Sequence, residues 1–435
     1  MKIQILLVSI LVFILFLAGC VENNDISDND SSSVSELFSY RDLLPAEISG
    51  LSEDFYPAGW TRSSILDKLP EAVSKTGNME FDSWSGVVRV TGDMHIGRLT
   101  IQPGTIVFIE ANSDDQNNGW VSTVDPMNPH EFLGENYSFH HIFIQVRDEL
   151  IARGTEDEPI IITSTSDDPW LADWEKIVFK KGVLEYAVVE HGIGMAIESS
   201  DVTISHCLIR NMLSQGVMFG SWPEAGIKGE SVSPNITYNY MYNFGHMAVQ
   251  SFYSEPMISN NIFIQRNTND SELYEYLSKG ENGALDLHGG NGTVEHNFLS
   301  SGYDSKIEKE RPKHGCSGIG ITTATKPKIS FNTIVGNNVG IELQGGNPII
   351  NYNNIHDNVD NNLVVRRVYS EPGREDTVIV YDGPIDVRNN WWGSSEQVLF
   401  TMNVGEGVEI SYEPFALQEI SSAGPDWSGF EWLYM

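Results

Sequence analysis

Apolar and polar residues follow a six-residue pattern that recurs through much of the chain. The pattern is an apolar residue, two variable positions, an asparagine, one variable position and a second apolar residue. An earlier copy begins at Ile204 and carries Cys207 in the asparagine position, and a later copy places Asn389 before Trp391. The complete copies begin at Ile236, Ile258, Val294, Ile329 and Ile350.

A second pattern lies between these copies and consists of a glycine followed by alternating apolar residues, as in the segments that begin at Gly216 and Gly340. Where no insertion intervenes, successive asparagines are 21 or 22 residues apart. Two short strands of period two, separated by glycine and asparagine corners, are typical of a solenoid whose coils stack on one another. The chain lacks the apolar period of the left-handed hexapeptide solenoid. The spacing therefore predicts an all-β fold, a right-handed parallel β-helix.

The recurring asparagines have a structural explanation. We expect each amide to turn inward at a corner and to hydrogen-bond to the asparagines of the neighbouring coils. The same winding places Cys207 and Cys316 about four coils apart, roughly 19 Å, which is too far for a disulfide. We therefore predict two free thiols, with Cys207 buried in the asparagine row. The predicted row contains Asn239, Asn261, Asn297, Asn332 and Asn353.

With these repeats the chain resembles the right-handed β-helix proteins of the pectate-lyase-like group, especially surface proteins of archaea and bacteria. The resemblance covers residues 84–415 and includes the closing segment Asn389-Asn-Trp-Trp-Gly393. It implies that Trp391 and Trp392 plug the C-terminal end of the core, and sugar binding is the alternative role for this pair. The polygalacturonase triplets Gly-His-Gly and Arg-Ile-Lys and the pectate-lyase motif Arg-x-Pro-x-x-Arg are absent. The resemblance therefore does not extend to either of those enzymes.

The N-terminus has the pattern of an export signal, with Lys2 followed by an apolar run. The stretch Leu17-Ala-Gly-Cys20 resembles a lipobox, which implies that a lipid on Cys20 anchors the protein in a bilayer. An uncleaved membrane anchor is the alternative, and both interpretations place the body outside the cytoplasm. The predicted order is a signal peptide at 1–19, a disordered acidic linker at 20–46, an N-terminal capping segment at 47–83, the β-helix at 84–415 and a C-terminal tail or cap at 416–435.

The formal net charge is −34, which argues against nucleic acid as a partner because phosphate binding needs lysine and arginine. No cofactor is expected. The acidic composition is compatible with calcium, but the run from Asp25 to Asp30 lacks the glycine and terminal glutamate of a calcium loop. His140 and His141 have no third ligand at an ordered spacing, so we predict no metal site.

Alternation along the glycine-led strands predicts which side chains face outward. Met247 and Val249 are the expected inward pair of one coil. One outward column is then Ala196, Met218, Ala248, Asp286, Gly320, Glu342 and Val364. The next outward column is Glu198, Gly220, Gln250, His288, Thr322, Gln344 and Arg366.

The polar members of these columns are the candidate site. Asp286 and Glu342 lie two coils apart, and a separation of about 6.5 to 9.5 Å between two carboxylates suits inverting glycoside hydrolysis. His288 is the third candidate catalytic residue, as a proton carrier. The candidate binding residues are Gln250, Thr322, Gln344 and Arg366, the last for an acidic sugar. Insertions at 268–282 and 302–316 are expected to form the wall of a groove.

Two interpretations of these columns remain open. A β-helix has a polar exterior in any case, so the same residues can be no more than a solvated face. The sequence therefore predicts a cell-surface lipoprotein, anchored at the cell membrane or outer membrane, with a structural or polysaccharide-binding role. The alternative is a polysaccharide hydrolase or lyase that acts in the groove, and a metal-handling role is disfavoured because ligand clusters are missing.

Overall fold

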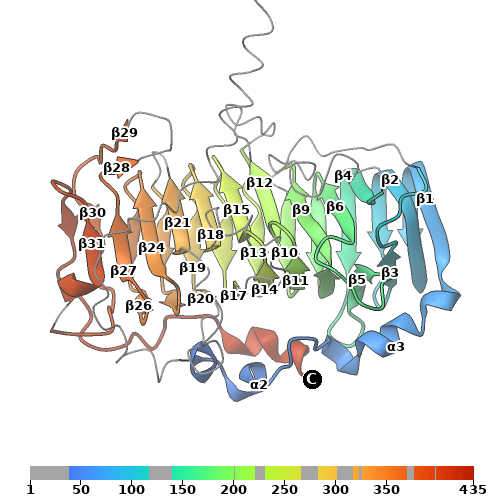
Figure 1. The fold of residues 1–435 in the computed structure, drawn as a ribbon, viewed down its shortest axis with the longest axis horizontal. Coiled ribbons are helices and arrows are strands. Elements are labelled where there is room, and N and C mark those ends of the chain that lie inside the picture. The colour runs from blue at the N-terminus through green and yellow to red at the C-terminus, as the bar shows by residue number, and fades with distance from the viewer. Residues whose placement is uncertain are drawn as a thin grey trace, which may run out of the picture.

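The computed structural model describes residues 39–116, 140–199, 201–220, 231–265, 283–300, 317–322, 326–369, 377–396 and 398–435. Figure 1 shows an elongated array of strands with short helices along one side. The described residues contain a 30-stranded sheet whose pairings are all parallel. A second, antiparallel sheet consists of β28 (Val368–Tyr369) and β29 (Thr377–Val378). The predicted all-β class and the parallel arrangement of the strands are confirmed.

The large sheet begins with two long strands, β1 (Val73–Trp84) and β2 (Val87–Ile101), which pair with each other. β2 then pairs with both β3 (Ile106–Ile109) and β4 (Phe143–Arg153). From β7 to β24, each strand pairs with the strand three places before it and the strand three places after it. Three ladders of parallel strands result.

Ladder 1 contains β7 (Gly182–Glu185), β10 (Val202–Ser205), β13 (Asn235–Thr237), β16 (Met257–Ser259), β19 (Thr293–Glu295), β22 (Lys328–Ser330), β25 (Ile349–Asn351), β30 (Ile385–Asp386) and β32 (Ile410–Ser411). Ladder 2 contains β3, β5 (Ile160–Ser164), β8 (Ala187–Glu190), β11 (Leu208–Met212), β14 (Tyr240–Phe244), β17 (Ile262–Ile264), β20 (Phe298–Ser300), β23 (Thr333–Val335) and β26 (Asn354–His356). Ladder 3 contains β4, β6 (Trp174–Phe179), β9 (Gly192–Ile197), β12 (Val217–Gly220), β15 (Met247–Phe252), β18 (Gly283–His288), β21 (Ser317–Thr322), β24 (Val339–Gln344), β27 (Asn361–Val365) and β31 (Met402–Val404).

One hydrophobic core receives side chains from all three ladders. Because side chains alternate between the two faces of a strand, every second residue faces this core. In ladder 1, Ile204 pairs with Ile236, and Ile236 pairs with Ile258, and all three are fully buried. Directly paired aliphatic side chains remove their apolar surface from water, which stabilises the stacked strands by about 25 cal/mol per Å² buried.

The predicted asparagine row is confirmed at the corner between ladders 1 and 2. The Nδ2 of Asn239 donates to Oδ1 of Asn261 at 2.9 Å, and the same bond recurs at 2.9 Å through the row. The backbone N–H of each asparagine also donates to the Oδ1 of the following one. The row contains Asn239, Asn261, Asn297, Asn332, Asn353 and Asn390, all fully buried.

The row differs from the prediction at its C-terminal end, where Asn390 and not Asn389 is the member. Ile349 pairs with Asp386, so Val387 takes the inward position that the sequence pattern gave to Asp386. At the other end, the backbone N–H of Cys207 donates to Asn239 Oδ1 at 3.0 Å. The thiol of Cys207 is buried and free, as predicted, whereas Cys316 lies outside the described residues.

Charged side chains close the N-terminal end of the core. Lys75 pairs with Val90 and Asp82 pairs with Leu99, so both point inward from β1. Their side chains form an ion pair of 2.9 Å, and Trp84 Nε1 donates to Asp82 at 2.7 Å. Inward charges on an end strand oppose pairing with another chain. The first strand of the sheet begins at Val73, eleven residues before residue 84, where the first strand was predicted to start.

The segment before β1 lies along the outward face of ladder 2 (Figure 1) and was predicted to be partly linker and partly end cap. Its elements are η1 (Tyr40–Leu43), α2 (Ala46–Ser49), η2 (Pro57–Gly59), α3 (Arg62–Leu66) and η3 (Leu69–Glu71). Tyr40 and Ile48 are buried against apolar side chains of ladder 2 such as Leu208. The described residues before β1 therefore pack on ladder 2 rather than on the end of the core.

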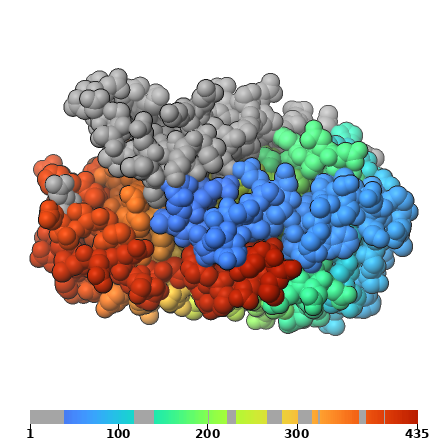
Figure 2. Space-filling view, turned by 90° about the horizontal axis from the view of Figure 1, so that it is seen from below, coloured from blue at the N-terminus to red at the C-terminus, as the bar shows by residue number. Residues whose placement is uncertain are grey.

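The C-terminal tail returns along the same side of the molecule. After η6 (Val398–Thr401), the chain passes β26, where Asn354 bonds to the backbone of Ile420, and reaches η7 (Trp427–Leu433). Figure 2 shows the C-terminal residues, in red, beside the N-terminal segment, in blue. Asp426 N donates to Asn260 Oδ1 at 3.0 Å, and the ring of Trp432 packs edge-on against Tyr186 at 5.8 Å. Both chain ends thus cover the outward face of ladder 2.

Of the tryptophan pair at the C-terminal end, only Trp392 belongs to the main core, where it is 1 % exposed. Trp391 is half-buried and packs against the ring of His356 at 4.5 Å. Only one indole of the pair is therefore part of the core.

A buried ion pair fastens the N-terminal segment to ladder 2. Glu190 accepts hydrogen bonds from Arg210 Nε at 2.8 Å and from the Tyr56 hydroxyl at 2.5 Å. Arg210 also donates to the backbone oxygens of Glu53 and Phe55. Burial alone would raise the pKa of Glu190, but the charge of Arg210, together with the hydrogen bonds, lowers it to about 2.

We expect Asn297→Ala to lower the free energy of unfolding by about 3 to 5 kcal/mol, because it removes the acceptor of the buried backbone N–H of Asn261 and the donor to the backbone oxygen of Ile258. Urea denaturation measures this change. The matched control is Asn291→Ala, since Asn291 is exposed and its removal should cost about 0.5 kcal/mol or less. Equal effects of the two changes would contradict the structural role of the row.

We expect acid to weaken the protein partly through Glu190. Its pKa is about 2 in the folded chain and about 4.3 in an unfolded one, so its ionised form stabilises the fold above the higher value, and this stabilisation is lost as the pH falls toward 2. Glu190→Gln should flatten the fall in unfolding free energy between pH 4.5 and pH 2 by up to about 1.4 kcal/mol per pH unit. Parallel pH profiles for the variant and the unaltered chain, measured by urea denaturation, would refute this assignment.

Candidate functional site

The candidate residues lie on the outward face of ladder 3, from β15 to β27 (Figure 1). In one column, Gln250 pairs with Asp286, Asp286 with Gly320, and Gly320 with Glu342. In the second column, Phe252 pairs with His288, His288 with Thr322, and Thr322 with Gln344, while Arg366 follows one strand later. The structure therefore brings all seven predicted site residues to one face.

The register of β15 corrects the prediction by two residues. Val249 pairs with both Val217 and Leu285, so Gln250 belongs to the column of Asp286, and Ala248 does not. Phe252 takes the place in the second column that was predicted for Gln250. A two-residue shift leaves the same side chains facing inward and outward, so alternation in the sequence cannot detect it.

A chain of hydrogen bonds leads to Asp286. Ser214 Oγ donates to Gln215 Oε1 at 2.5 Å, and Gln215 Nε2 donates to Gln250 Oε1 at 2.8 Å. Gln250 Nε2 then donates to Asp286 Oδ2 at 2.9 Å. The two glutamine amides in this series each donate through nitrogen and accept through oxygen. The series of hydrogen bonds therefore holds the Asp286 carboxylate in one orientation.

Asp286 and Thr322 hold the imidazole of His288 between them. His288 Nε2 lies 2.6 Å from Asp286 Oδ2, and the Thr322 hydroxyl lies 2.6 Å from His288 Nδ1. Because a carboxylate can only accept, the neutral imidazole carries its hydrogen on Nε2, and Nδ1 accepts the hydrogen of Thr322. The ring of Phe252 stacks on the imidazole at 5.2 Å and 26°, which keeps water from that face.

The three candidate catalytic residues are buried, whereas Thr322 and Gln344 are partly buried and Arg366 is exposed. Asp286 is 1 % exposed, His288 is 5 % exposed and Glu342 is 8 % exposed. Buried polar groups need partners, because an unpaired one costs about 1–3 kcal/mol. All but one of the polar side-chain atoms of Asp286 and His288 have a hydrogen-bond partner. This network indicates that the residues form an organised site.

The exception is Asp286 Oδ1, which is buried and has no hydrogen-bond partner in the described part of the chain. A Cβ on Gly320 would lie 3.7 Å from this oxygen, in ordinary van der Waals contact, so the glycine leaves room for about one methyl group beside it. On the far side of Gly320, Glu342 Oε1 accepts from Arg366 Nε at 2.7 Å and from Gln344 Nε2 at 3.4 Å. The Asp286 carboxylate therefore has one oxygen without a hydrogen-bond partner among the described residues, and the Glu342 carboxylate is held by the guanidinium of Arg366.

Sequence reasoning missed Ser214, Gln215 and Phe252. The correct register of β15 places Phe252 in the second column, beside His288. Gln215 and Ser214 lie at a corner before β12, where no alternating pattern marks their direction. The insertions 268–282 and 302–316, predicted to wall a groove, lie outside the described residues.

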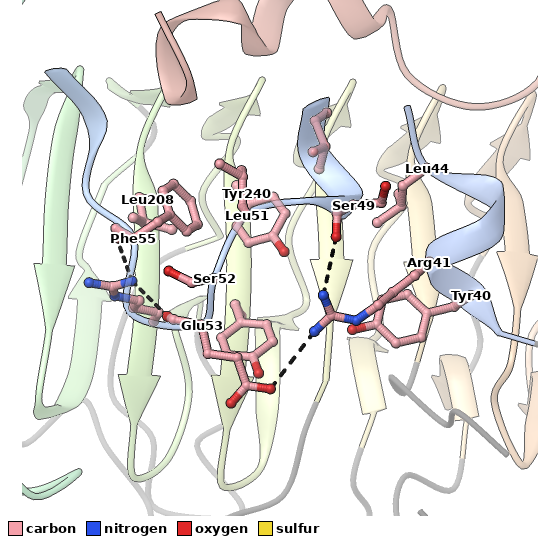
Figure 3. Close-up of a pocket in the computed structure, with 13 residues that line it drawn as sticks. Tyr40, Arg41, Leu44, Ser49, Leu51, Ser52, Glu53, Phe55, Leu208 and Tyr240 are labelled. Atoms are coloured by element: carbon pink, nitrogen blue, oxygen red, sulfur yellow. Dashed lines mark hydrogen bonds and ion pairs between the residues drawn. The ribbon is translucent and has the colours of Figure 1, made fainter. Parts of the chain in front are cut away.

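One cavity beside the sheet is too small for a ligand. It lies between the N-terminal segment and ladder 2, lined by Tyr40, Phe55 and Tyr240 among others (Figure 3), and holds about 10 Å³, room for about one water molecule. Arg41 crosses it, with its guanidinium 3.8 Å from Glu53 and 3.3 Å from the backbone oxygen of Ser49. It is a packing interface between the segment and the sheet.

Two further features bear on the candidate chemistry. Among the residues with described positions, no three histidine, cysteine, aspartate or glutamate side chains are grouped so that they could hold a metal ion. Over the same residues, no helix combines the length and the apolar character needed to span a membrane.

Comparisons of the chain with protein-family models, with curated proteins and with solved structures give no match.

Proposed function

We propose that the three ladders are the sides of a right-handed parallel β-helix of the pectate-lyase-like kind. The strand pairing with a period of three and the buried asparagine row support this winding. Right-handed crossovers between parallel strands are found in about 98 % of cases, which supports the hand. Residues 73–411 supply its strands, and the two chain ends lie outside them.

The mature protein is an extracytoplasmic lipoprotein, held by an acyl chain on Cys20 at the cell membrane or outer membrane. Support for this part comes from the sequence of residues 1–20, which precede the described residues. The net charge of −34 gives the body solubility and low affinity for anionic surfaces.

The body binds polysaccharide along ladder 3. The observation that carries this proposal is the buried, unpartnered Asp286 Oδ1 beside the space over Gly320. A sugar hydroxyl placed there would donate the missing hydrogen bond and remove the cost of an unpaired acceptor. Arg366 and Gln344, in the strands that follow, supply donors for further hydroxyl or carboxyl groups.

A second candidate function is inverting hydrolysis of the same polysaccharide. Asp286 and Glu342 lie in one column with only Gly320 between them, so their backbones are about 9.6 Å apart. Glu342, paired with Arg366, would act as the base that activates water, and Asp286 would protonate the leaving oxygen.

We expect the full-length chain in detergent to co-sediment with at least one insoluble acidic or neutral polysaccharide. Gly320→Leu should weaken this binding at least tenfold, about 1.4 kcal/mol, because the new side chain fills the space beside Asp286. The control is Thr293→Leu, on the outward face of ladder 1, which should bind as the unaltered chain does. Failure to bind any polysaccharide, or equal binding by Gly320→Leu, would refute the proposed function.

If the protein also hydrolyses its glycan, new reducing ends should appear with inverted anomeric configuration, observed by proton NMR at early times. Asp286→Asn and Glu342→Gln should each abolish this release, because both carboxyl groups take part in the single displacement. Retained configuration, or hydrolysis that survives either change, would exclude this second function.

A further inference from the structure

Three side chains on ladder 3 have the arrangement of a nucleophile, a base and an orienting acid. The Thr322 hydroxyl lies 2.6 Å from His288 Nδ1, and His288 Nε2 lies 2.6 Å from Asp286 Oδ2. A hydroxyl within hydrogen-bond reach of an imidazole, which a carboxylate orients from its other side, is the arrangement that activates an alcohol as a nucleophile. We propose that Thr322, His288 and Asp286 form an acyl-transfer site that hydrolyses esters carried by a polysaccharide.

The burial of the three residues agrees with these roles. Asp286 and His288 are buried, whereas Thr322 is only partly buried, so Thr322 is the member of the set with the most contact with solvent. Phe252 covers one face of the imidazole, and Gln250 holds the same carboxylate oxygen that His288 contacts. Gln250 is thus a positioning residue, which acts on His288 through Asp286.

Donors for the oxyanion lie on the opposite side of Thr322. Gln344 pairs with Thr322 in the next strand, and Arg366 follows one strand beyond. The order of this column is therefore base, nucleophile, amide donor and cation. Charge that develops on the carbonyl oxygen of the substrate would face N–H groups, which is the electrostatic requirement for acyl transfer.

The reaction balances with water as the only co-reactant. Thr322 Oγ1 forms a bond to the acyl carbon while its proton passes to His288 Nδ1. The bond from the acyl carbon to the sugar oxygen then breaks, and that oxygen takes the proton from His288. A water molecule attacks the acyl-threonine with His288 again as base, which releases the carboxylic acid and restores the Thr322 hydroxyl.

The identity of the substrate as an ester on a sugar rests on the proposed polysaccharide binding, but the acyl-transfer chemistry does not. p-Nitrophenyl acetate, which contains no sugar, therefore tests the three residues alone. The full-length chain in detergent should hydrolyse it, and Thr322→Val should lower the rate at least about 100-fold. Thr322→Ser, which keeps a hydroxyl, should retain the rate within about tenfold.

Two further arms complete the experiment. Thr293→Val, a matched change on the outward face of ladder 1, should hydrolyse the ester at the rate of the unaltered chain. Diisopropyl fluorophosphate should form a covalent adduct on the peptide that contains Thr322, identified by mass spectrometry, and no adduct should form there in Thr322→Val. The unfolding midpoint of each variant shows whether it has folded.

The proposal is overturned if the unaltered chain neither hydrolyses the ester nor takes the label, or if Thr322→Val hydrolyses it at the same rate. In either case, polysaccharide binding keeps its own test through Gly320→Leu. Conversely, the chain can hydrolyse the ester through Thr322 and yet bind no polysaccharide. That result would support the acyl-transfer site and would exclude a sugar ester as its substrate.

Discussion

The rest of the structure depends on the hydrogen bonds of one buried row of asparagine amides. A corner between two parallel strands leaves backbone groups that the strands cannot pair, and burial makes each such group costly. Each side chain in the row accepts from the backbone and the amide of the preceding member, and it donates to the following one. The row joins ladder 1 to ladder 2 at a fixed residue in successive corners from β13/β14 to β25/β26.

The sequence predicted most of this framework because its signals are local and periodic. Alternating apolar residues mark the strands, and a polar residue at one fixed corner marks the row. Errors arose where two alignments satisfy the same pattern. Asn389 and Asn390 both fit the corner, and only burial of Val387 decides between them. The two-residue shift in register at Gln250 leaves every side chain of β15 on the same face of the sheet. Only the pairing of β15 with β12 and β18 therefore reveals it.

The candidate site was predicted by position but not by chemistry. Asp286, Gly320, Glu342 and Thr322 lie in the expected columns, yet the bonds that connect Gln250, Asp286 and His288 depend on side-chain directions that a pattern does not contain. The covering of ladder 2 by residues 39–71 was also missed, since that segment has no apolar period. What holds it, the ion pair of Glu190 and Arg210, joins residues to a segment about 150 positions earlier in the chain.

The return of the C-terminal tail to Tyr186 has a consequence for the order of folding. The tail contacts the corner residues Phe331, Asn260 and Tyr238. The surface that it packs against therefore forms only after the strands between β8 and β23 have stacked. During synthesis, the part of the apolar exterior of ladder 2 that the tail covers stays exposed until these residues arrive. The nascent body is therefore most prone to aggregate just before its final 16 residues, 420–435, emerge.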